Sequence, residues 1–197
     1  MTRLLLCVSL LISSASFAQN GFFRADATIG GAFTTGNLKS YGISAGVEPK
    51  YFFNENISVG LRLSGEALFG GSIDGASSEV SLGISSRAAN GIKGEYYLGS
   101  GNTKPFAGLM IGYYTQANIG TAVQGGGANV TASAVRTIGF GPELGVTFGN
   151  FRISGIYHLV PGKDLVSINT AVGGVEQVEI SRNYFVIQLG FRIFGTD

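Results

Sequence analysis

Apolar and polar residues alternate between Tyr41 and Phe69, on both sides of the sequence Asn54-Glu55-Asn56. Most apolar residues occupy odd positions and the charged residues occupy even positions, with the same phase before and after the turn. Successive residues of a β-strand point to opposite faces, so the pattern predicts a hairpin with one apolar face and one charged face. The three-residue turn is expected to place Phe53 opposite Ile57. Which face looks outward decides what kind of protein this is.

The first 18 residues have the pattern of a secretory signal peptide. Arg3 precedes an apolar run from Leu4 to Ile12, and small residues then lead to Ala18, the expected cleavage site. The run is too short to span a bilayer as a helix, which takes roughly 20 apolar residues. We therefore predict that residues 1–18 are removed on export and that residues 19–197 form a single domain. Cleavage would also remove Cys7, the only cysteine, so the mature chain could form no disulfide.

The composition is apolar for an exported protein. The mean hydropathy is +0.29 and only 13% of the residues are charged, yet no segment after the signal is a candidate transmembrane helix. A soluble β-protein would need more polar surface, whereas a membrane barrel exposes its apolar face to lipid. Without Arg3, 12 basic residues balance 12 acidic ones. This neutral balance predicts no nucleic-acid partner, because nucleic acids are bound by basic surfaces.

About eight strands are predicted in the mature chain. Their ranges are Phe23–Phe33, Tyr41–Phe53, Ile57–Phe69, a segment within Glu79–Leu98, Pro105–Ala117, Ala132–Phe148, Phe151–Leu159 and Glu179–Phe194. Three connections are short turns, at Asn54-Glu55-Asn56, Gly99–Lys104 and Gly149-Asn150. The connections that alternate with them are longer loops, at Gly70–Ser78, Ile119–Thr131 and Val160–Val178. Short turns at one end and long loops at the other are typical of outer-membrane barrels, whose short turns are periplasmic.

The charged residues of these strands lie on one face, and the apolar residues lie on the other face. The charged residues are Arg24, Asp26, Glu48, Lys50, Arg62, Glu66, Lys93, Glu95, Glu143, Arg152 and Arg192. If this face points inward, the six basic and five acidic side chains form a charge-compensated structural network in the lumen. In a soluble, lipocalin-like barrel the same alternation would place them on a solvated exterior.

Three features favour the membrane barrel over the soluble one. They are the high mean hydropathy, the small residues that share the charged face, and the aromatic residues near the ends of the strands. Aromatic residues gather at the membrane–water interfaces of such barrels. The expected girdle on the periplasmic side consists of Phe52, Phe53, Tyr96, Tyr97, Phe148, Phe151, Phe191 and Phe194.

Four segments resemble the small bacterial outer-membrane β-barrel domain family, the OmpA/OmpX-like eight-stranded barrels. Pro49–Leu61 looks like the second hairpin of that family, and Lys104–Gly108 and Gly141–Val146 are similar to its fifth and sixth strands. Gln188–Phe194 resembles the C-terminal signal read by the barrel-insertion machinery, although Gly195-Thr196-Asp197 follow it. The resemblance implies a transmembrane up-and-down antiparallel β-barrel in the bacterial outer membrane, an all-β fold preceded by a cleaved signal peptide.

Few residues suggest catalysis or metal binding. His158 is the only histidine, so a site built from several histidines and cysteines is excluded from the mature chain, and we expect no metal and no cofactor. His158 would be the general base of a lipid-hydrolysing barrel similar to lipid A deacylases. Those enzymes present a serine two positions after the histidine, whereas here the sequence is His158-Leu159-Val160. A hydrogen-bonded histidine in the lumen is the simpler interpretation.

The expected size of the barrel bears on transport. A barrel of about eight strands has a lumen just wide enough to be filled by side chains. We therefore expect a monomeric, non-enzymatic outer-membrane protein that anchors surface loops and contributes to envelope integrity or adhesion. Its expected partners are outer-membrane lipid, the barrel-assembly machinery through the C-terminal strand, and a surface ligand through the long loops. The alternatives are a narrow porin-like pore for ions or small solutes and a lipid-modifying barrel enzyme.

Overall fold

The computed structural model describes residues 21–35, 40–73, 80–124, 127–169 and 175–195. The signal peptide predicted for residues 1–18 lies outside this set. The strands are β1 (Phe22–Thr34), β2 (Tyr41–Phe52), β3 (Ile57–Ile73), β4 (Val80–Tyr97), β5 (Thr103–Gln124), β6 (Gly127–Phe148), β7 (Phe151–His158), β8 (Lys163–Asn169), β9 (Val175–Ser181) and β10 (Tyr184–Phe194). No helix in the described ranges is long and apolar enough to cross a membrane.

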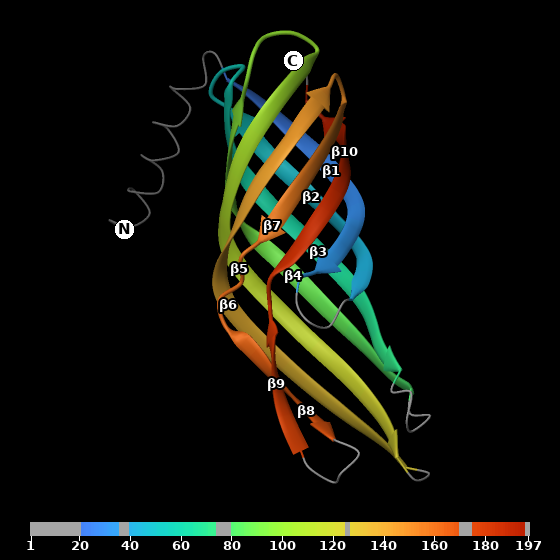
Figure 1. The fold of residues 1–197 in the computed structure, drawn as a ribbon. Helices are drawn as coiled ribbons and strands as arrows, with labels where there is room; N and C mark the ends of the chain where they lie inside the picture. Colours follow the sequence, from blue (N-terminus) through green and yellow to red (C-terminus); the bar gives the residue numbers. More distant parts are fainter. Residues whose placement is uncertain (1–20, 36–39, 74–79, 125–126, 170–174, 196–197) are drawn as a thin grey trace, which may run out of the picture.

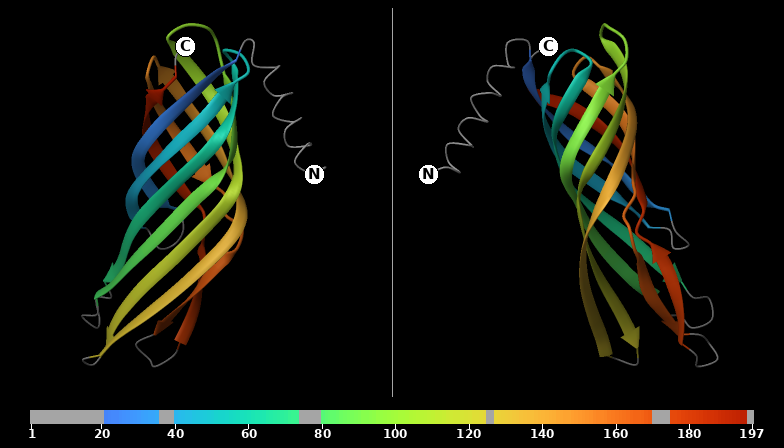
Figure 2. Two further views of the ribbon diagram at one scale, coloured as in Figure 1. Left: turned by 180° about the vertical axis from the view of Figure 1, so that it is seen from behind. Right: turned by 90° about the vertical axis from the view of Figure 1, so that its left-hand side faces the viewer.

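Eight strands close into one antiparallel barrel in the order β1-β10-β7-β6-β5-β4-β3-β2. The last strand, β10, closes the barrel by pairing with β7 on one side and β1 on the other. Between β7 and β10 in the chain, β8 and β9 form a separate two-stranded sheet. Figures 1 and 2 show short turns at one end of the barrel and extended hairpins at the other. The predicted up-and-down barrel of about eight strands is therefore confirmed.

Local residue chemistry explains two of the short turns. The side-chain oxygen of Asn54 accepts the backbone N–H groups of Asn56 and Ile57, each at 2.9 Å, and the backbone N–H of Phe53 donates to the carbonyl of Ile57 at 3.0 Å. Gly149 has a φ of +56°, which suits a two-residue hairpin turn and places Phe148 opposite Phe151. Both turns keep the pairing register that the sequence pattern predicts.

The two faces of each strand have opposite environments. On β3, Leu61 is 51% exposed, whereas the neighbouring Arg62 is fully buried. On β6, Leu144 is 71% exposed, whereas Glu143 is 2% exposed. The apolar face therefore covers the outside of the barrel, and the charged face fills its interior.

Two of the predicted long loops are mainly strand, which corrects the sequence analysis. The predicted loop Ile119–Thr131 belongs to β5 and β6 except for residues 125–126, which lie outside the described ranges. The two strands pair continuously from Thr103 opposite Phe148 to Gln124 opposite Gly127. The predicted loop Val160–Val178 contains β8 and the first part of β9. Both segments are rich in small residues and lack a clear apolar alternation, but ladder hydrogen bonds use the backbone alone. The β5–β6 pairing set within the barrel therefore continues beyond it, whereas β8 and β9 pair with each other in a separate sheet.

Two further expectations are corrected at strand ends. The predicted strand Glu179–Phe194 is divided, because β9 ends at Ser181 and β10 begins at Tyr184. The predicted loop Gly70–Ser78 is strand as far as Ile73, and residues 74–79 lie outside the described ranges.

The predicted aromatic girdle is wrong for two of its members. Phe52 and Tyr97 are 3% and 2% exposed and point into the barrel, whereas the other six members are exposed on the outside. The reason is strand parity, because Phe52 and Tyr97 occupy the same face as Lys50 and Glu95 on their strands. Inside, Phe52 lies between Phe22 and Tyr97, with ring centroids 4.6 Å and 5.4 Å away.

Candidate functional site

The interior of the barrel contains the charged residues that the strand alternation singled out. Ten of the eleven are buried, and they come from β1, β2, β3, β4, β6 and β7. Residues two positions apart on a strand share a face, so each strand contributes one or two charged groups at a similar depth. Arg192, at the end of β10, is half-buried. Closure of the barrel thus brings together charges that are far apart in the chain.

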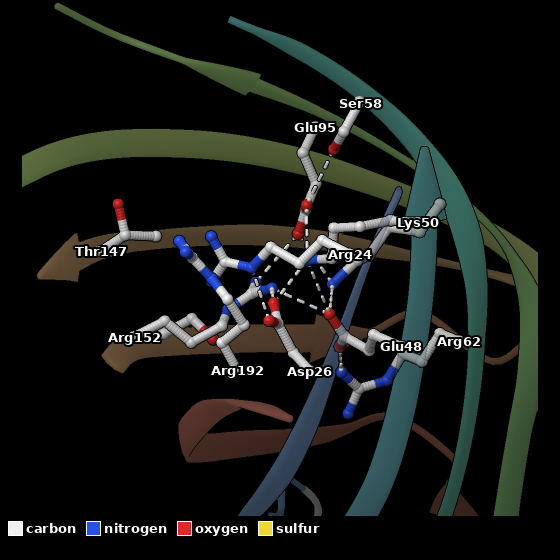
Figure 3. Close-up of polar contacts among 12 residues, drawn as sticks. Arg24, Asp26, Glu48, Lys50, Ser58, Arg62, Glu95, Thr147, Arg152 and Arg192 are labelled. Carbon is white, nitrogen blue, oxygen red and sulfur yellow. Dashed lines mark hydrogen bonds and ion pairs between the residues drawn. The ribbon is translucent and has the colours of Figure 1, made fainter. Parts of the chain in front are cut away.

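Glu48 on β2 receives four cations (Figure 3). Lys93 Nζ lies 2.5 Å and Arg152 Nη1 2.8 Å from its Oε2 atom. Lys50 Nζ lies 3.4 Å from the same oxygen, and Arg62 Nη1 donates to Oε1. A buried carboxylate is tolerated only when it is paired and hydrogen-bonded, and these donors meet that condition.

Arg152 on β7 links carboxylates from several strands. Its Nη2 atom lies 2.5 Å from Glu143 Oε1 and 2.9 Å from Glu95 Oε1. Its Nη1 atom lies 3.6 Å from Asp26 Oδ2, in addition to the contact with Glu48. The guanidinium also lies over the ring of Phe106, 4.4 Å from its centroid. Arg152 therefore connects β7 to β1, β2, β4, β5 and β6.

Two lysines complete the network. Lys50 Nζ lies 2.8 Å from Glu95 Oε2 and 3.0 Å from Asp26 Oδ2. Lys93 Nζ lies 2.9 Å from both Glu95 Oε1 and Glu143 Oε2. Asp26 also accepts a hydrogen bond from Arg24 Nε at 2.6 Å. Each of the four carboxylates in this group thus has at least two cationic partners.

Several uncharged side chains belong to the same network, and the sequence analysis missed them because it considered charges alone. Gln188 accepts from Arg62 Nη2 at 2.9 Å and donates to Ser154 Oγ at 3.1 Å. Tyr97 Oη donates to Glu95 at 2.7 Å, and Ser58 Oγ donates to it at 3.1 Å. The signal was present in the sequence, because all of these residues lie at inward positions of the predicted strands.

Glu66 has different neighbours. Its carboxylate accepts hydrogen bonds from Ser64 Oγ at 3.0 Å and from Ser44 Oγ and Tyr184 Oη at 3.4 Å each. Within the described part of the chain it makes no ion pair closer than 4 Å. Arg192 lies at the short-turn end, where its Nη2 atom donates to the carbonyl of Gly149 at 3.3 Å.

His158 occupies an aromatic site in the interior, away from the lipid face. Its Nδ1 atom shares a hydrogen bond with Tyr114 Oη at 2.9 Å, and its ring stacks on Tyr184 with centroids 4.3 Å apart. Arg87 lies over the other residue of this stack, 4.8 Å from the Tyr184 centroid. The partner of His158 among the described residues is therefore a tyrosine, whereas a lipid-hydrolysing barrel would need a serine.

The chemistry of the interior is that of a densely paired ion network. Asp26, Glu48, Glu95 and Glu143 are already paired with cations, and Glu66 accepts hydrogen bonds from hydroxyl groups, so a general acid or base would have to leave its partners before acting. Among the described residues, no group of three His, Cys, Asp or Glu side chains could hold a metal ion. The arrangement fills the lumen and neutralises its charges.

The position of the two faces decides between the membrane and soluble alternatives. A soluble barrel requires the charged face outside, but Arg62, Glu48 and Arg152 are at most 1% exposed and large apolar residues cover the exterior. In a closed antiparallel barrel, the backbone N–H and C=O groups are hydrogen-bonded between strands. With this arrangement of faces, the barrel exposes apolar side chains to the lipid chains. The chain is an eight-stranded outer-membrane β-barrel. The aliphatic residues between the strand ends form its lipid-facing surface.

Comparisons with known proteins found likenesses among solved structures alone. No protein-family model and no curated protein matches the sequence. The attachment invasion locus protein Ail of Yersinia pestis, solved with the heparin analogue sucrose octasulfate, is 11% identical, with a TM-score of 0.49 over 89% of this chain and 100% of that chain. The N-terminal barrel domain of Pseudomonas aeruginosa OprF is 14% identical, with a TM-score of 0.39 over 87% and 99% of the two chains. The membrane assignment rests on the exposed and buried faces, and we draw no function from these likenesses.

Proposed function

We propose that this outer-membrane barrel is a non-enzymatic surface anchor, which presents β-hairpins outside the cell for adhesion and contributes to envelope integrity. The observation that carries the proposal is the length of the hairpins relative to the barrel. β6 pairs with β5 back to Gly127, whereas its ladder with β7 begins only at Glu143, apart from one bridge at Phe140. At about 3.3 Å per residue, the hairpin extends roughly 40 Å along the strand past the Phe140 bridge. Such projections suit contact with an external surface.

The interior supports an anchor over a pore. Several ion pairs join strands that are not neighbours in the barrel, and the side chains that make them are at most 5% exposed. An eight-stranded barrel leaves space for side chains to fill, and here large charged side chains do so. Little room is left for a continuous water path. We therefore expect the wild-type protein to conduct poorly in planar bilayers.

The site of His158 supports a non-enzymatic role. A lipid-modifying enzyme must bring its base to the bilayer, but His158 is fully buried against Tyr114 and Tyr184 inside the barrel. Overexpression should accordingly leave the masses of lipid A unchanged. A new lipid A species that disappears in His158→Ala would favour the enzymatic alternative.

The proposal is tested by shortening one hairpin without changing its register. Asn118 lies opposite Ser133, so residues 119–132 can be replaced by Asn-Gly, which forms a tight hairpin turn. The shortened barrel should keep its heat-modifiable gel mobility, because the barrel part of the strands is intact. Attachment of the bacteria to host cells and to coated surfaces should fall.

A length-matched control separates the effect of the sequence from that of reach. In this control, residues 119–132 are replaced by a Thr/Ser-rich strand pair of equal length with the same register. Loss of attachment in both variants would assign binding to the side chains of the hairpin. Attachment and detergent resistance equal to wild type after all the long hairpins are shortened would refute the anchor, as would a large, steady conductance of the unmodified protein.

A further inference from the structure

The short-turn end of the barrel contains an open cavity of about 410 Å³. Its lining comes from the ends of β1, β2, β4, β5, β6 and β10 and from the turns between them. The ion network lies beneath it, because Arg24 in its lining pairs with Asp26, and Tyr97 donates to Glu95. The cavity is therefore a closed-ended vestibule, and its volume falls in the range of sites for small molecules.

The vestibule has a positive lining. Among the described residues, Arg24, Lys104 and Arg192 face it, together with one carboxylate, Glu55. Glu55 sits on an exposed turn, and its Oε2 atom is 3.3 Å from Lys104 Nζ, so this pair is accessible to water. Opposite charges at an exposed pair contribute little, and water or an incoming ligand competes with them easily. An anion that entered the vestibule would therefore meet Lys104 with little competition from Glu55.

Arg24 supplies a donor that is held ready for such an anion. The side chain is 5% exposed, and its Nε atom is fixed by Asp26 at 2.6 Å. Its Nη2 atom, by contrast, has no hydrogen-bond partner among the residues that the structure describes. A buried donor without a partner costs free energy, and a guanidinium fork binds carboxylate or phosphate oxygens with good geometry. An anion in the vestibule would satisfy this group.

Another part of the lining is aromatic. Phe22 and Phe52 stack with ring centroids 4.6 Å apart and an interplanar angle of 7°, and Tyr97 continues the row 5.4 Å from Phe52. All three line the vestibule. A ligand that carries an apolar ring beside its anionic group would cover these faces while its charge meets the arginines.

We infer that the vestibule is a binding site for a small organic anion, with a carboxylate or phosphate held by Arg24 and Arg192 and a ring or apolar chain packed against Phe22 and Phe52. The site is separate from the surface hairpins, so it does not depend on the adhesive role. With the short turns on the periplasmic side, the ligand enters from the periplasm.

The test uses the full mature chain folded in zwitterionic detergent, with phenyl phosphate as the probe in calorimetric titrations. Saturable binding is expected, and inorganic phosphate and phenol should each bind more weakly because each meets only half of the site. Arg192→Gln should weaken phenyl phosphate binding about tenfold, the effect of losing a charge-assisted hydrogen bond. Glu55→Gln should strengthen binding, because it removes the carboxylate that the described part of the lining contains.

Lys163→Gln is the matched control, because it removes one exposed positive charge at the opposite end of the molecule. Its affinity for phenyl phosphate should equal that of wild type. Should Arg192→Gln fail to show heat-modifiable mobility, Lys104→Gln replaces it, since Lys104 lies at the rim. Absence of saturable binding, or equal losses in Lys163→Gln and the vestibule variants, would overturn the site. Equal affinity for phenyl phosphate and inorganic phosphate would overturn the aromatic half of the inference.

Discussion

Arg152 is the residue on which the interior of the barrel converges. Its guanidinium contacts Asp26, Glu48, Glu95 and Glu143, which belong to four different strands. Buried ion pairs of this kind contribute little net stability when whole, because desolvation offsets attraction. Removing one member is different, since the remaining charges stay buried without compensation. The loss of Arg152 is therefore expected to lower the stability by more than its ion pairs contribute when they are intact.

Arg152→Ala is predicted to lower the free energy of unfolding by about 3 to 5 kcal/mol, the range found when a buried ion pair loses one partner. The physical cause is the excess of negative charge left around Glu95 and Glu143 in the lumen. Equilibrium urea unfolding of the barrel in lipid vesicles measures this change.

Lys104→Ala is the control at the same scale, because Lys104 pairs once, with the exposed Glu55. Exposed pairs contribute about 0 to 1 kcal/mol, so the variant should be close to wild type. Similar losses for Lys104→Ala and Arg152→Ala would contradict the importance of the buried network.

At the scale of a single element, the two faces of β6 differ in the residues that they carry. Its outward residues include Leu144, which is 71% exposed, and its inward face combines Glu143 with several glycines. A Cβ atom on Gly145 would lie 2.6 Å from the ring of Phe106. The glycines of the inward face thus leave room for large side chains from β5, which explains why small and charged residues occur on the same face.

Leu144→Arg is predicted to lower the stability of the barrel in bilayers by about 2 to 4 kcal/mol, the cost of a cation at the lipid-facing midplane. The matched variant Tyr41→Arg, at the end of β2 where the strand meets the long-hairpin end, should change stability by about 0 to 1 kcal/mol. Unfolding in vesicles compares the two. Equal costs at the two positions would show that Leu144 does not face the membrane core.

At the scale of the whole molecule, the two ends of the barrel differ in kind. One end has tight turns and the vestibule, and the other has the hairpins β3–β4, β5–β6 and β8–β9 (Figure 2). Bacterial outer-membrane barrels keep short turns in the periplasm and longer connections outside. This asymmetry leads to a prediction of orientation.

Single cysteines report the orientation cleanly, because the only native cysteine, Cys7, lies in the predicted signal peptide. In intact cells, a membrane-impermeant maleimide should label Gly127→Cys, at the tip of β6, and spare Ser100→Cys, in a short turn. After the outer membrane is permeabilised, both should react. Labelling of Ser100→Cys alone in intact cells would invert the proposed topology and place the vestibule outside the cell.

The sequence by itself determined the parity of the strands. The alternation around Asn54-Glu55-Asn56 placed Arg62 and Glu48 on one face of the hairpin. It placed Leu61 and Val47 on the other face, and the structure keeps these assignments. Parity is a local property, because it follows from the geometry of one strand and needs no partner. The short turns were equally readable, since Gly149 and Asn54 stabilise them through their own conformation and side-chain hydrogen bonds.

The tertiary structure alone decided which residues meet and how far the strands extend. The bond from Arg62 to Gln188 joins residues 126 positions apart, and it depends on barrel closure and strand stagger, which no local pattern records. The small residues of the β5–β6 hairpin show no alternation that predicts a strand. They form strands because the backbone pairing of β5 and β6 continues beyond the barrel. Strand parity alone turns Phe52 and Tyr97 inward, but only closure of the barrel brings their ring centroids to 5.4 Å from each other.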